Sequence, residues 1–324
     1  MREGWRPTAS RDTLRLRARL LLDIRAFFAQ RGVLEVETPL LSTSRSTDPH
    51  LSSFPVRYQH RELYLNTSPE YCMKRLLAAY GDAIYQICKS FRDDELGPMH
   101  NPEFTMLEWY RPNVDMFGLM DELGDLVQTL ALRNDFGTDR IVRLSYAEAF
   151  QLAAGIDPHA TTAEECRCCA RRHEIEQPVG LQDNVDEWLD WLLTQLVIPS
   201  FRTDAFTFLY DYPRTQSALA KLYKNQGGYT VAARFELFYG EMELANGFDE
   251  LLDAGEQRQR FERENLARQA AGQQPSTIDE YLLAALEHGL PPCSGVALGL
   301  DRLLMLFSGT AALEQVLAFP FSRI

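Results

Sequence analysis

The chain has 324 residues, of which 45% are hydrophobic and 24% are charged, so it can bury a sizeable core. Lysine and arginine together number 33 and aspartate and glutamate 46, which gives a net charge of −13. Because such a surface repels polyphosphates, the composition argues against extensive contact with nucleic acid. No apolar run approaches the length of about 18 residues that a membrane span requires. We therefore expect one cytoplasmic domain, residues 1–324, with no membrane partner.

The amino-terminal segment predicts a helix followed by an edge strand. Residues 13–31 repeat apolar side chains at helical spacing, and Gly32 after them tolerates the positive φ found beyond a helix. The arginines among residues 1–19 then form the polar face of this helix rather than a targeting peptide. Residues 33–38 are typical of a strand that Pro39 stops, which suits the edge of a sheet or an interface.

A second helix signal follows at Ser68. Serine is a good N-cap and Pro69 suits the first helical position, so residues 71–80 are expected to be helical up to Gly81. Glu70 then lies in the first turn, where a carboxylate complements the helix dipole. The helix dipole alone could therefore explain Glu70, and a functional role is an equally open alternative.

The stretch 91–111 has the pattern of strand, loop and strand, and it contains an unusual carboxylate. In the second strand, a period of two places Phe104, Met106, Glu108 and Tyr110 on one face. A carboxylate between aromatic rings is costly to bury unless a cation meets it. For an isolated strand, the simpler interpretation is that Glu108 lies in water.

Two further carboxylates fall on a predicted hairpin at 231–247. If Tyr239-Gly240 is a two-residue loop, Glu236 lies opposite Glu243 on one face. Like charges about 5 Å apart destabilise a sheet, and a hard divalent ion such as Mg²⁺ would relieve the repulsion. The alternatives are a bulge that separates the two side chains, or exposure to water.

A strand of small residues at 293–299 precedes the last helix. Gly295, Ala297 and Gly299 alternate, so one face of the strand is almost free of side chains. A planar ligand could approach the backbone there, with the guanidinium of Arg302 at the strand–helix junction to cover it. Tight packing of strand on helix is the alternative explanation.

The rest of the chain is mostly helical, and residues 155–200 are its least informative part, interpreted as an insertion or an appended helical layer. Helices are expected at 116–132, 185–196, 248–273 and 275–288. Cys166, Cys168 and Cys169 lack the paired spacing of structural zinc sites, so we expect reduced thiols there.

Three of these segments together resemble the catalytic domain of class II aminoacyl-tRNA synthetases. The segments similar to motifs 1, 2 and 3 are the one that ends at Pro39, 91–111 and 295–307. Signatures similar to those of lysyl-tRNA synthetases are T-S-P-E at 67–70, H-N-P-E-F-T-M-L-E at 100–108 and N-G-F-x-E-L at 246–251. The resemblance implies an α+β fold with an antiparallel sheet flanked by helices, and a homodimer.

A lysyl-tRNA synthetase would carry an anticodon-binding domain before motif 1, but here motif 1 begins almost at the first residue. We therefore expect no anticodon-binding domain and no tRNA partner. A stand-alone domain of this kind resembles the ligases that attach (R)-β-lysine to elongation factor P. That resemblance implies activation of β-lysine by ATP as an adenylate and transfer to a lysine side chain of the factor.

Other functions stay open at this point. One alternative is a ligase that activates α-lysine, or a truncated lysyl-tRNA synthetase-like enzyme with another acceptor. A catalytically inactive regulator that binds a basic ligand is a third possibility. It is weakened because the residues that the family uses for catalysis are present.

The resemblance also implies roles for individual residues. Arg92 would bind the α-phosphate and the carboxylate of the activated acid, Phe104 would stack on adenine, and Arg302 would cover its other side. The remaining nucleotide contacts would be Asp94, His100, Asn101 and Gly299. Mg²⁺ would be held by Glu236 and Glu243. The amino-acid pocket would be formed by Ser68, Glu70, Glu108, Tyr110, Asn246, Glu250 and Ala297.

Three positions depart from the family pattern. Asp94 stands where motif 2 usually has Glu, so its contact with the adenine amino group would be longer or shared. Pro98 replaces a basic loop residue, which removes one expected phosphate contact. Ala297 stands where lysyl-tRNA synthetases commonly have Gly. We expect its methyl group to crowd an α-amino group and to favour the displaced amine of β-lysine.

Overall fold

The computed structural model describes residues 5–93, 96–177, 181 and 183–324, and the chain divides into two compact units. Unit 1 joins Met1–Val114 to Leu251–Ile324, whereas unit 2 is the continuous segment Asp115–Glu250. The predicted nucleotide contact Asp94 lies outside the described residues. The interpretation of the whole chain as one catalytic domain stays a prediction.

Unit 1 combines two sheets with five helices among its described residues. Its elements are α1 (Arg11–Gln30), β1 (Leu34–Glu35), β2 (Leu41–Ser42), β3 (Pro55–Tyr58), β4 (Arg61–Leu65), α2 (Glu70–Tyr80), β5 (Ile84–Phe91), β6 (Glu103–Pro112), α7 (Ala254–Ala270), α8 (Glu280–Gly289), β12 (Cys293–Gly299) and α9 (Leu300–Ser308). One sheet has the order β1-β5-β6-β12 and the other β2-β4-β3. Strands β1 and β5 run parallel, and the other described pairs of unit 1 are antiparallel.

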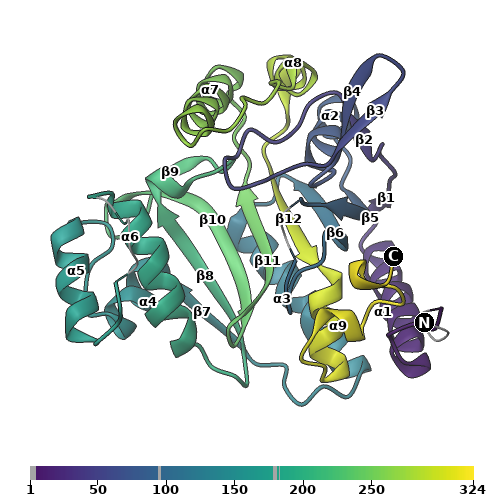
Figure 1. The fold of residues 1–324 in the computed structure, drawn as a ribbon, viewed down its shortest axis with the longest axis horizontal. Coiled ribbons are helices and arrows are strands. Elements are labelled where there is room, and N and C mark those ends of the chain that lie inside the picture. Colours follow the sequence, from purple (N-terminus) through teal and green to yellow (C-terminus); the bar gives the residue numbers. More distant parts are fainter. Residues whose placement is uncertain (1–4, 94–95, 178–180, 182) are drawn as a thin grey trace. The chain divides into compact units, whose positions relative to one another are not determined.

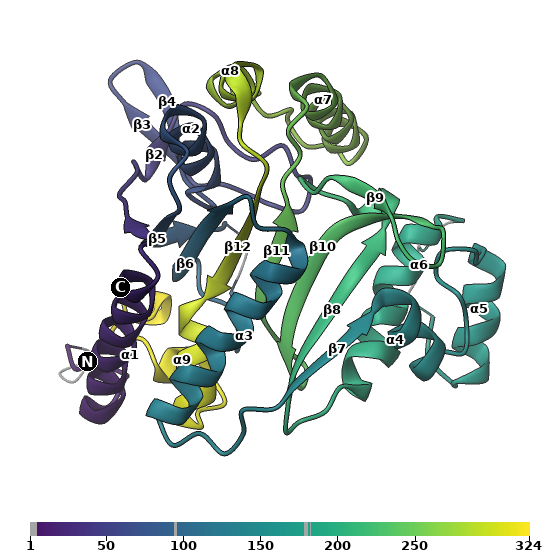
Figure 2. The ribbon, with the colours of Figure 1, turned by 180° about the vertical axis from the view of Figure 1, so that it is seen from behind.

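Segments far apart in the sequence lie side by side in unit 1. Helix α1 packs against α9, and α2 packs against α8, which also contacts α7 (Figure 1). The view from behind shows the same grouping of the first and last helices (Figure 2). The two ends of the chain thus contribute to one compact body.

The predicted first helix is confirmed. Ser10 Oγ accepts a hydrogen bond from the Thr13 backbone N–H at 3.0 Å, and Gly32 beyond the helix has a φ of +66°. The apolar face packs into the core, with Ile24 and Phe28 fully buried. The strand predicted at 33–38 is shorter than expected, because only Leu34–Glu35 pairs with β5, at the edge of the sheet.

Unit 2 has a second group of strands, in the order β11-β10-β8-β7, with β9 paired to β10. Its elements are α3 (Met116–Arg133), β7 (Ile141–Ser145), α4 (Tyr146–Ala153), α5 (Ala163–Arg172), α6 (Val185–Leu192), β8 (Phe206–Pro213), β9 (Leu222–Lys224), β10 (Thr230–Tyr239) and β11 (Met242–Asp249). Strands β7 and β8 run parallel, whereas β8, β9 and β11 are antiparallel to β10. The predicted helices at 116–132 and 185–196 are present, although a π-helical turn, Leu193–Val197, continues the second one.

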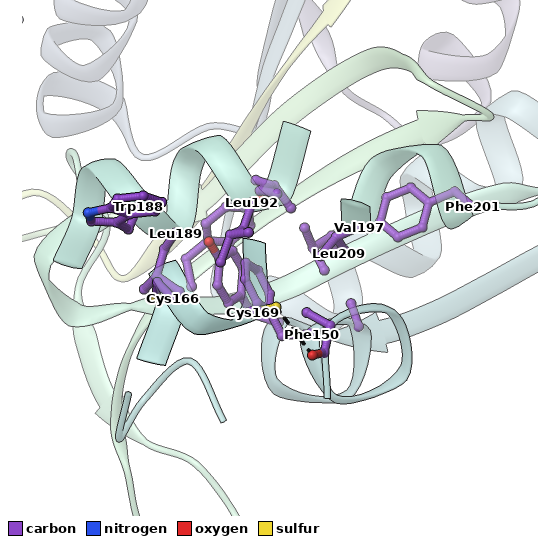
Figure 3. Close-up of a cluster of buried hydrophobic side chains, with 14 of the residues drawn as sticks. Phe150, Cys166, Cys169, Trp188, Leu189, Leu192, Val197, Phe201 and Leu209 are labelled. Atoms are coloured by element: carbon purple, nitrogen blue, oxygen red, sulfur yellow. Dashed lines mark hydrogen bonds between the residues drawn. The ribbon is translucent and has the colours of Figure 1, made fainter. Parts of the chain in front are cut away.

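The helices from 155–200 share one apolar core with α4 and with strands β8 and β10 of unit 2 (Figure 3). Cys166 and Cys169 are fully buried among side chains such as Phe150 and Trp188, and Cys169 Sγ lies 3.4 Å from the Ala154 carbonyl oxygen. Burial raises the pKa of both thiols. Within the described ranges, no group of three His, Cys, Asp or Glu residues could hold a metal ion. The two buried cysteines therefore act as core residues.

The described part of the chain contains no helix with the length and apolar character needed to cross a membrane.

Candidate active site

Glu108 is the centre of the unit 1 site, and its environment contradicts the simpler interpretation of a solvated carboxylate. It is only 2% exposed. Tyr110 Oη donates a hydrogen bond to Glu108 Oε1, and Ser68 Oγ donates one to Oε2, both at 2.7 Å. The contact between Glu108 and Tyr110 confirms that these two residues share a face of β6, as the period of two predicted.

The pKa of Glu108 is raised to about 7. Burial is the largest cause, and the nearby charge of Glu70 raises it further. The hydroxyl groups of Tyr110 and Ser68 and the ammonium of Lys74 act in the opposite direction. A second cation would strongly stabilise this buried carboxylate, because a nearby positive charge favours its ionised form.

Glu70 and Lys74 form a buried ion pair one helical turn apart on α2. Lys74 is 3% exposed, and its Nζ lies 2.5 Å from Glu70 Oε1. The Glu70 backbone N–H donates a hydrogen bond to Ser68 Oγ at 3.0 Å, so Ser68 links the start of α2 to Glu108. We call Ser68, Glu70, Lys74, Glu108 and Tyr110 the Glu108 cluster. Lys74 was not predicted, although its i+4 spacing from Glu70 was a usable signal.

The small residues of β12 lie directly beside this face of β6. Ala297 pairs with Glu108, while Gly295 pairs with Tyr110. Side chains of directly opposite residues in such a pair have Cβ atoms about 4.5–5.5 Å apart. The methyl group of Ala297 therefore lies next to the buried carboxylate, where the sequence pattern indicated an open face.

The predicted phosphate and adenine contacts lie further along the same strand. The Arg92 guanidinium lies 5.1 Å from the centre of the Phe104 ring. Phe104 and Glu108 are four residues apart on one face of β6, or about 13 Å. The end of the site formed by Arg92 and Phe104 is therefore separated from the anionic end at Glu108 by about 13 Å along β6.

Arg302 extends from the first turn of α9, and Gly299 precedes that helix as its N-cap residue. Arg302 Nη2 lies 2.8 Å from His100 Nε2, so two of the predicted nucleotide contacts meet. Asn101 makes hydrogen bonds within the protein: its Nδ2 donates to the Glu103 carbonyl oxygen, and its Oδ1 accepts from the Phe321 N–H.

Asp301 is a supporting residue that the sequence analysis missed. It is 2% exposed, and its two oxygens accept hydrogen bonds from Arg17 Nη2 at 2.5 Å and from the Thr105 N–H at 2.6 Å. Asp301 thus ties α9, which carries Arg302, to both α1 and β6. A buried aspartate at the start of an apolar helix was the available signal.

The predicted register of the unit 2 hairpin is wrong. Glu236 lies opposite Asn246, not Glu243, and Glu243 lies opposite Phe238. The reason is a bulge next to Leu237, which shifts the two strands relative to each other. Phe238, the partner of Glu243, is two residues from Glu236 and therefore on the same face of β10. Glu236 and Glu243 thus still share a face, but as diagonal rather than directly opposite neighbours.

Glu236 is held by two partners within unit 2. Tyr212 Oη donates to Glu236 Oε2 at 2.6 Å, and Arg234 donates to Oε1. Burial lowers the pKa of Arg234, but the charges of Glu236 and Glu243 contribute to a net rise. Both carboxylates therefore act on one internal cation.

The donor set on this face fits Mg²⁺ in kind. Mg²⁺ takes hard oxygen ligands and is commonly held by one or two carboxylates plus substrate phosphates. Asn246 Oδ1 on the same face is buried and has no hydrogen-bond partner among the residues described, so it is ready for a donor. Glu250 is nearby in sequence and 2% exposed. These four predicted site residues belong to unit 2, and all the others that the structure describes belong to unit 1.

The strand–loop–strand around Arg92, the strand–helix around Arg302 and the predominantly antiparallel strands define the catalytic domain of a class II aminoacyl-tRNA synthetase. The chain belongs to the family described as tRNA synthetases class II (D, K and N), whose family model matches residues 4–323. Among similar proteins are those named elongation factor P--(R)-beta-lysine ligase from Salmonella arizonae, Salmonella paratyphi B and Salmonella dublin. Each is 46% identical over 325 residues, which cover 98% of both chains.

Proposed function

We propose that this chain is an ATP-dependent ligase that activates (R)-β-lysine as an adenylate and transfers it to a lysine side chain of elongation factor P. The structural observation that carries the proposal is the buried Glu108 cluster, which suits the ammonium group of a basic amino acid. The amino acid and the acceptor come from the shared name of the relatives, which match 98% of this chain.

Activation requires charge neutralisation and positioning more than acid–base chemistry. A carboxylate oxygen of the amino acid attacks the α-phosphorus, and pyrophosphate leaves. Arg92 would bind both reacting groups, and its position over Phe104 orients it towards the adenine end of the site. Arg302 would stack on adenine and keep its contact with His100. In the second half-reaction the neutral acceptor amine attacks the adenylate carbonyl, and AMP leaves.

Glu236 and Glu243 would hold Mg²⁺. When bound, this ion would neutralise phosphate charge and orient the leaving pyrophosphate. Arg234 supplies a cation to the same two carboxylates in the protein itself, which lowers the cost of burying them. Asn246 and Glu250 stay predicted contacts of the amino acid.

The identity of the amino acid would depend on Ala297. Its methyl group lies beside Glu108, the predicted ammonium acceptor. An added methyl group in a filled site changes discrimination by about 10- to 200-fold. We infer that it disfavours an α-amino group and leaves room for the amine of β-lysine, which is displaced by one carbon.

The acceptor would be a protein rather than tRNA, because a net charge of −13 opposes phosphate binding. Since elongation factor P serves translation, the enzyme would act in the cytoplasm. We also propose a homodimer. Apolar side chains are exposed on the segment that resembles motif 1, including Leu22 and Leu34, and a second copy would cover them.

The direct test is to incubate the protein with ATP, (R)-β-lysine and purified elongation factor P and to measure the mass of the factor. We expect the mass of one β-lysyl group to be added. A factor whose acceptor lysine is replaced by arginine is the control, and it should stay unmodified.

Pyrophosphate exchange with β-lysine and with α-lysine separates the alternatives. A preference for α-lysine would favour the α-lysine ligase, and efficient charging of bulk tRNA would refute the protein acceptor. If no amino acid supports exchange, the inactive regulator is the better description.

A further inference from the structure

We propose that Lys74 is a positioning residue of the amino-acid site: its ammonium fixes the Glu70 carboxylate and counters its charge, so that Glu108 ionises more readily to bind a substrate ammonium. The identity of that substrate rests on the proposed function, whereas the positioning role concerns unit 1 itself.

Lys74 is buried, unlike an ordinary surface lysine. Its side chain is 3% exposed, although a buried lysine costs free energy unless an anion meets it. The anion is Glu70, one turn earlier on α2, at 2.5 Å. The backbone N–H of Glu70 donates to Ser68 Oγ, which in turn donates to Glu108 Oε2, so Ser68 holds the start of α2, the helix that carries both Glu70 and Lys74, beside Glu108.

The charges act on Glu108 in opposite directions. Glu70 raises its pKa, while Lys74 lowers it. Two neighbouring carboxylates without a cation tend to share one proton rather than ionise together. A protonated Glu108 binds an ammonium only after it has lost its proton. Because Lys74 lowers the pKa of Glu108, it reduces this competition near neutral pH.

The other groups that face Glu108 do not replace Lys74. Tyr110 and Ser68 donate hydrogen bonds to it but carry no positive charge. On the neighbouring strand β5, Gln86 pairs with Glu108 in register. The pKa of Cys88 is raised to about 12, first by burial and then by Glu108, so this thiol is neutral. Lys74 is thus the cation of unit 1 that acts on Glu108 in the described structure.

The first experiment follows Glu108 in ligand-free protein by NMR, with ¹³C at glutamate Cδ and the signal assigned by its loss in Glu108→Gln. In Lys74→Met we expect the titration midpoint of Glu108 to rise by about one pH unit or more. Lys74→Arg keeps the charge and should titrate like the wild type. Lys89→Met is the matched control, because Lys89 also makes a salt bridge, with Glu103 at 3.2 Å, but on the surface.

A second pair of variants keeps the test valid if Lys74→Met does not fold. Glu70→Gln removes the charge that raises the pKa of Glu108, so its midpoint should fall. In the double variant Glu70→Gln/Lys74→Met, the titration midpoint of Glu108 should be higher than in Glu70→Gln alone, because the second substitution removes the positive charge that lowers the pKa of Glu108. This pair isolates the effect of Lys74 without an unpaired Glu70.

The kinetic readout is pyrophosphate exchange with β-lysine. We expect Lys74→Met to raise KM for β-lysine about tenfold at pH 7, with a smaller change in kcat and none in KM for ATP. The acid limb of kcat/KM should move up with the NMR midpoint. An unchanged midpoint in both comparisons, or a failure of Lys74→Arg to restore it, would overturn the inference. Absence of exchange in the wild type, with the midpoints shifted as expected, would instead refute only the proposed function.

Discussion

Replacing Glu108 with glutamine should make the protein more stable above pH 7 while it abolishes activation of the amino acid. The folded protein raises the pKa of Glu108 from its ordinary value of 4.5 to about 7. At about 1.4 kcal/mol for each pKa unit, the ionised carboxylate costs the folded state about 3 kcal/mol. Because the folded state holds its proton to higher pH, wild-type stability falls as pH rises from 4.5 through 7, and it is level above.

Glutamine removes that cost but loses part of the hydrogen bonding. Its amide has one acceptor oxygen, so Ser68 or Tyr110 is left facing an NH₂ group, at a cost of about 1 kcal/mol. The net gain is therefore about 2 kcal/mol at pH 8, or roughly 4 °C in Tm for a chain of this size. Near pH 5 the wild-type carboxylate is protonated in the folded state, so the two proteins should differ little.

The assay is thermal unfolding of wild type and Glu108→Gln at pH 5 and pH 8, together with pyrophosphate exchange. We expect kcat/KM for β-lysine to fall at least about 100-fold, because a neutral amide cannot pair with the substrate ammonium. Glu287→Gln, which removes an exposed carboxylate on α8, is the control for a simple change in net charge. A Tm difference that is the same at both pH values would refute the raised pKa of Glu108.

Three further predictions concern specificity, the metal and the oligomeric state. Ala297→Gly should raise exchange with α-lysine relative to β-lysine by about tenfold or more, and an unchanged ratio would contradict the role given to the methyl group. Glu243→Gln should increase the Mg²⁺ concentration required for half-maximal exchange several-fold, with KM for β-lysine unaltered; an identical Mg²⁺ titration would exclude Glu243 as a ligand. Leu34→Glu puts a charge on the exposed edge strand and should shift sedimentation from dimer to monomer, whereas a monomeric wild type would disprove the dimer.

The elements that could be predicted are those whose pattern is set locally. Helices α1 and α2 have an apolar stripe that does not depend on the rest of the chain, and glycine ends both. The predicted N-cap of α2 is wrong by one residue, because Pro69 rather than Ser68 is the N-cap and has no side-chain hydrogen bond to offer. The two faces of β6 follow from the period of two alone. By contrast, β8 was missed although its aromatic residues at 206, 208, 210 and 212 recur with a period of two; in the structure both of its faces are buried.

The hairpin register depended on information that the local sequence does not contain. Strand periodicity identified β10 and β11, but the bulge next to Leu237 is set by how both strands pack on their neighbours. The prediction that Glu236 and Glu243 face each other therefore failed. Asp301 was missed for a related reason, since its partners Arg17 and Thr105 are distant in sequence.

Each unit contains a pair of carboxylates with an internal cation. In unit 2, Arg234 forms an ion pair with Glu236, two residues away on β10, and its pKa is also raised by the charge of Glu243. In unit 1, Lys74 forms an ion pair with Glu70, one helical turn away on α2, and its charge also lowers the pKa of Glu108. Unmatched carboxylates buried in this way would cost several kcal/mol each, so an internal cation allows the chain to fold before a ligand arrives. Two carboxylates and one cation retain a net negative charge, which a substrate ammonium or a metal ion would neutralise. Sequence patterns reveal Glu108, Glu236 and Glu243 because they interrupt apolar strands. The spacing of Lys74 from Glu70 indicates a local ion pair, but the action of Lys74 on Glu108 becomes apparent only when the side chains are placed in three dimensions.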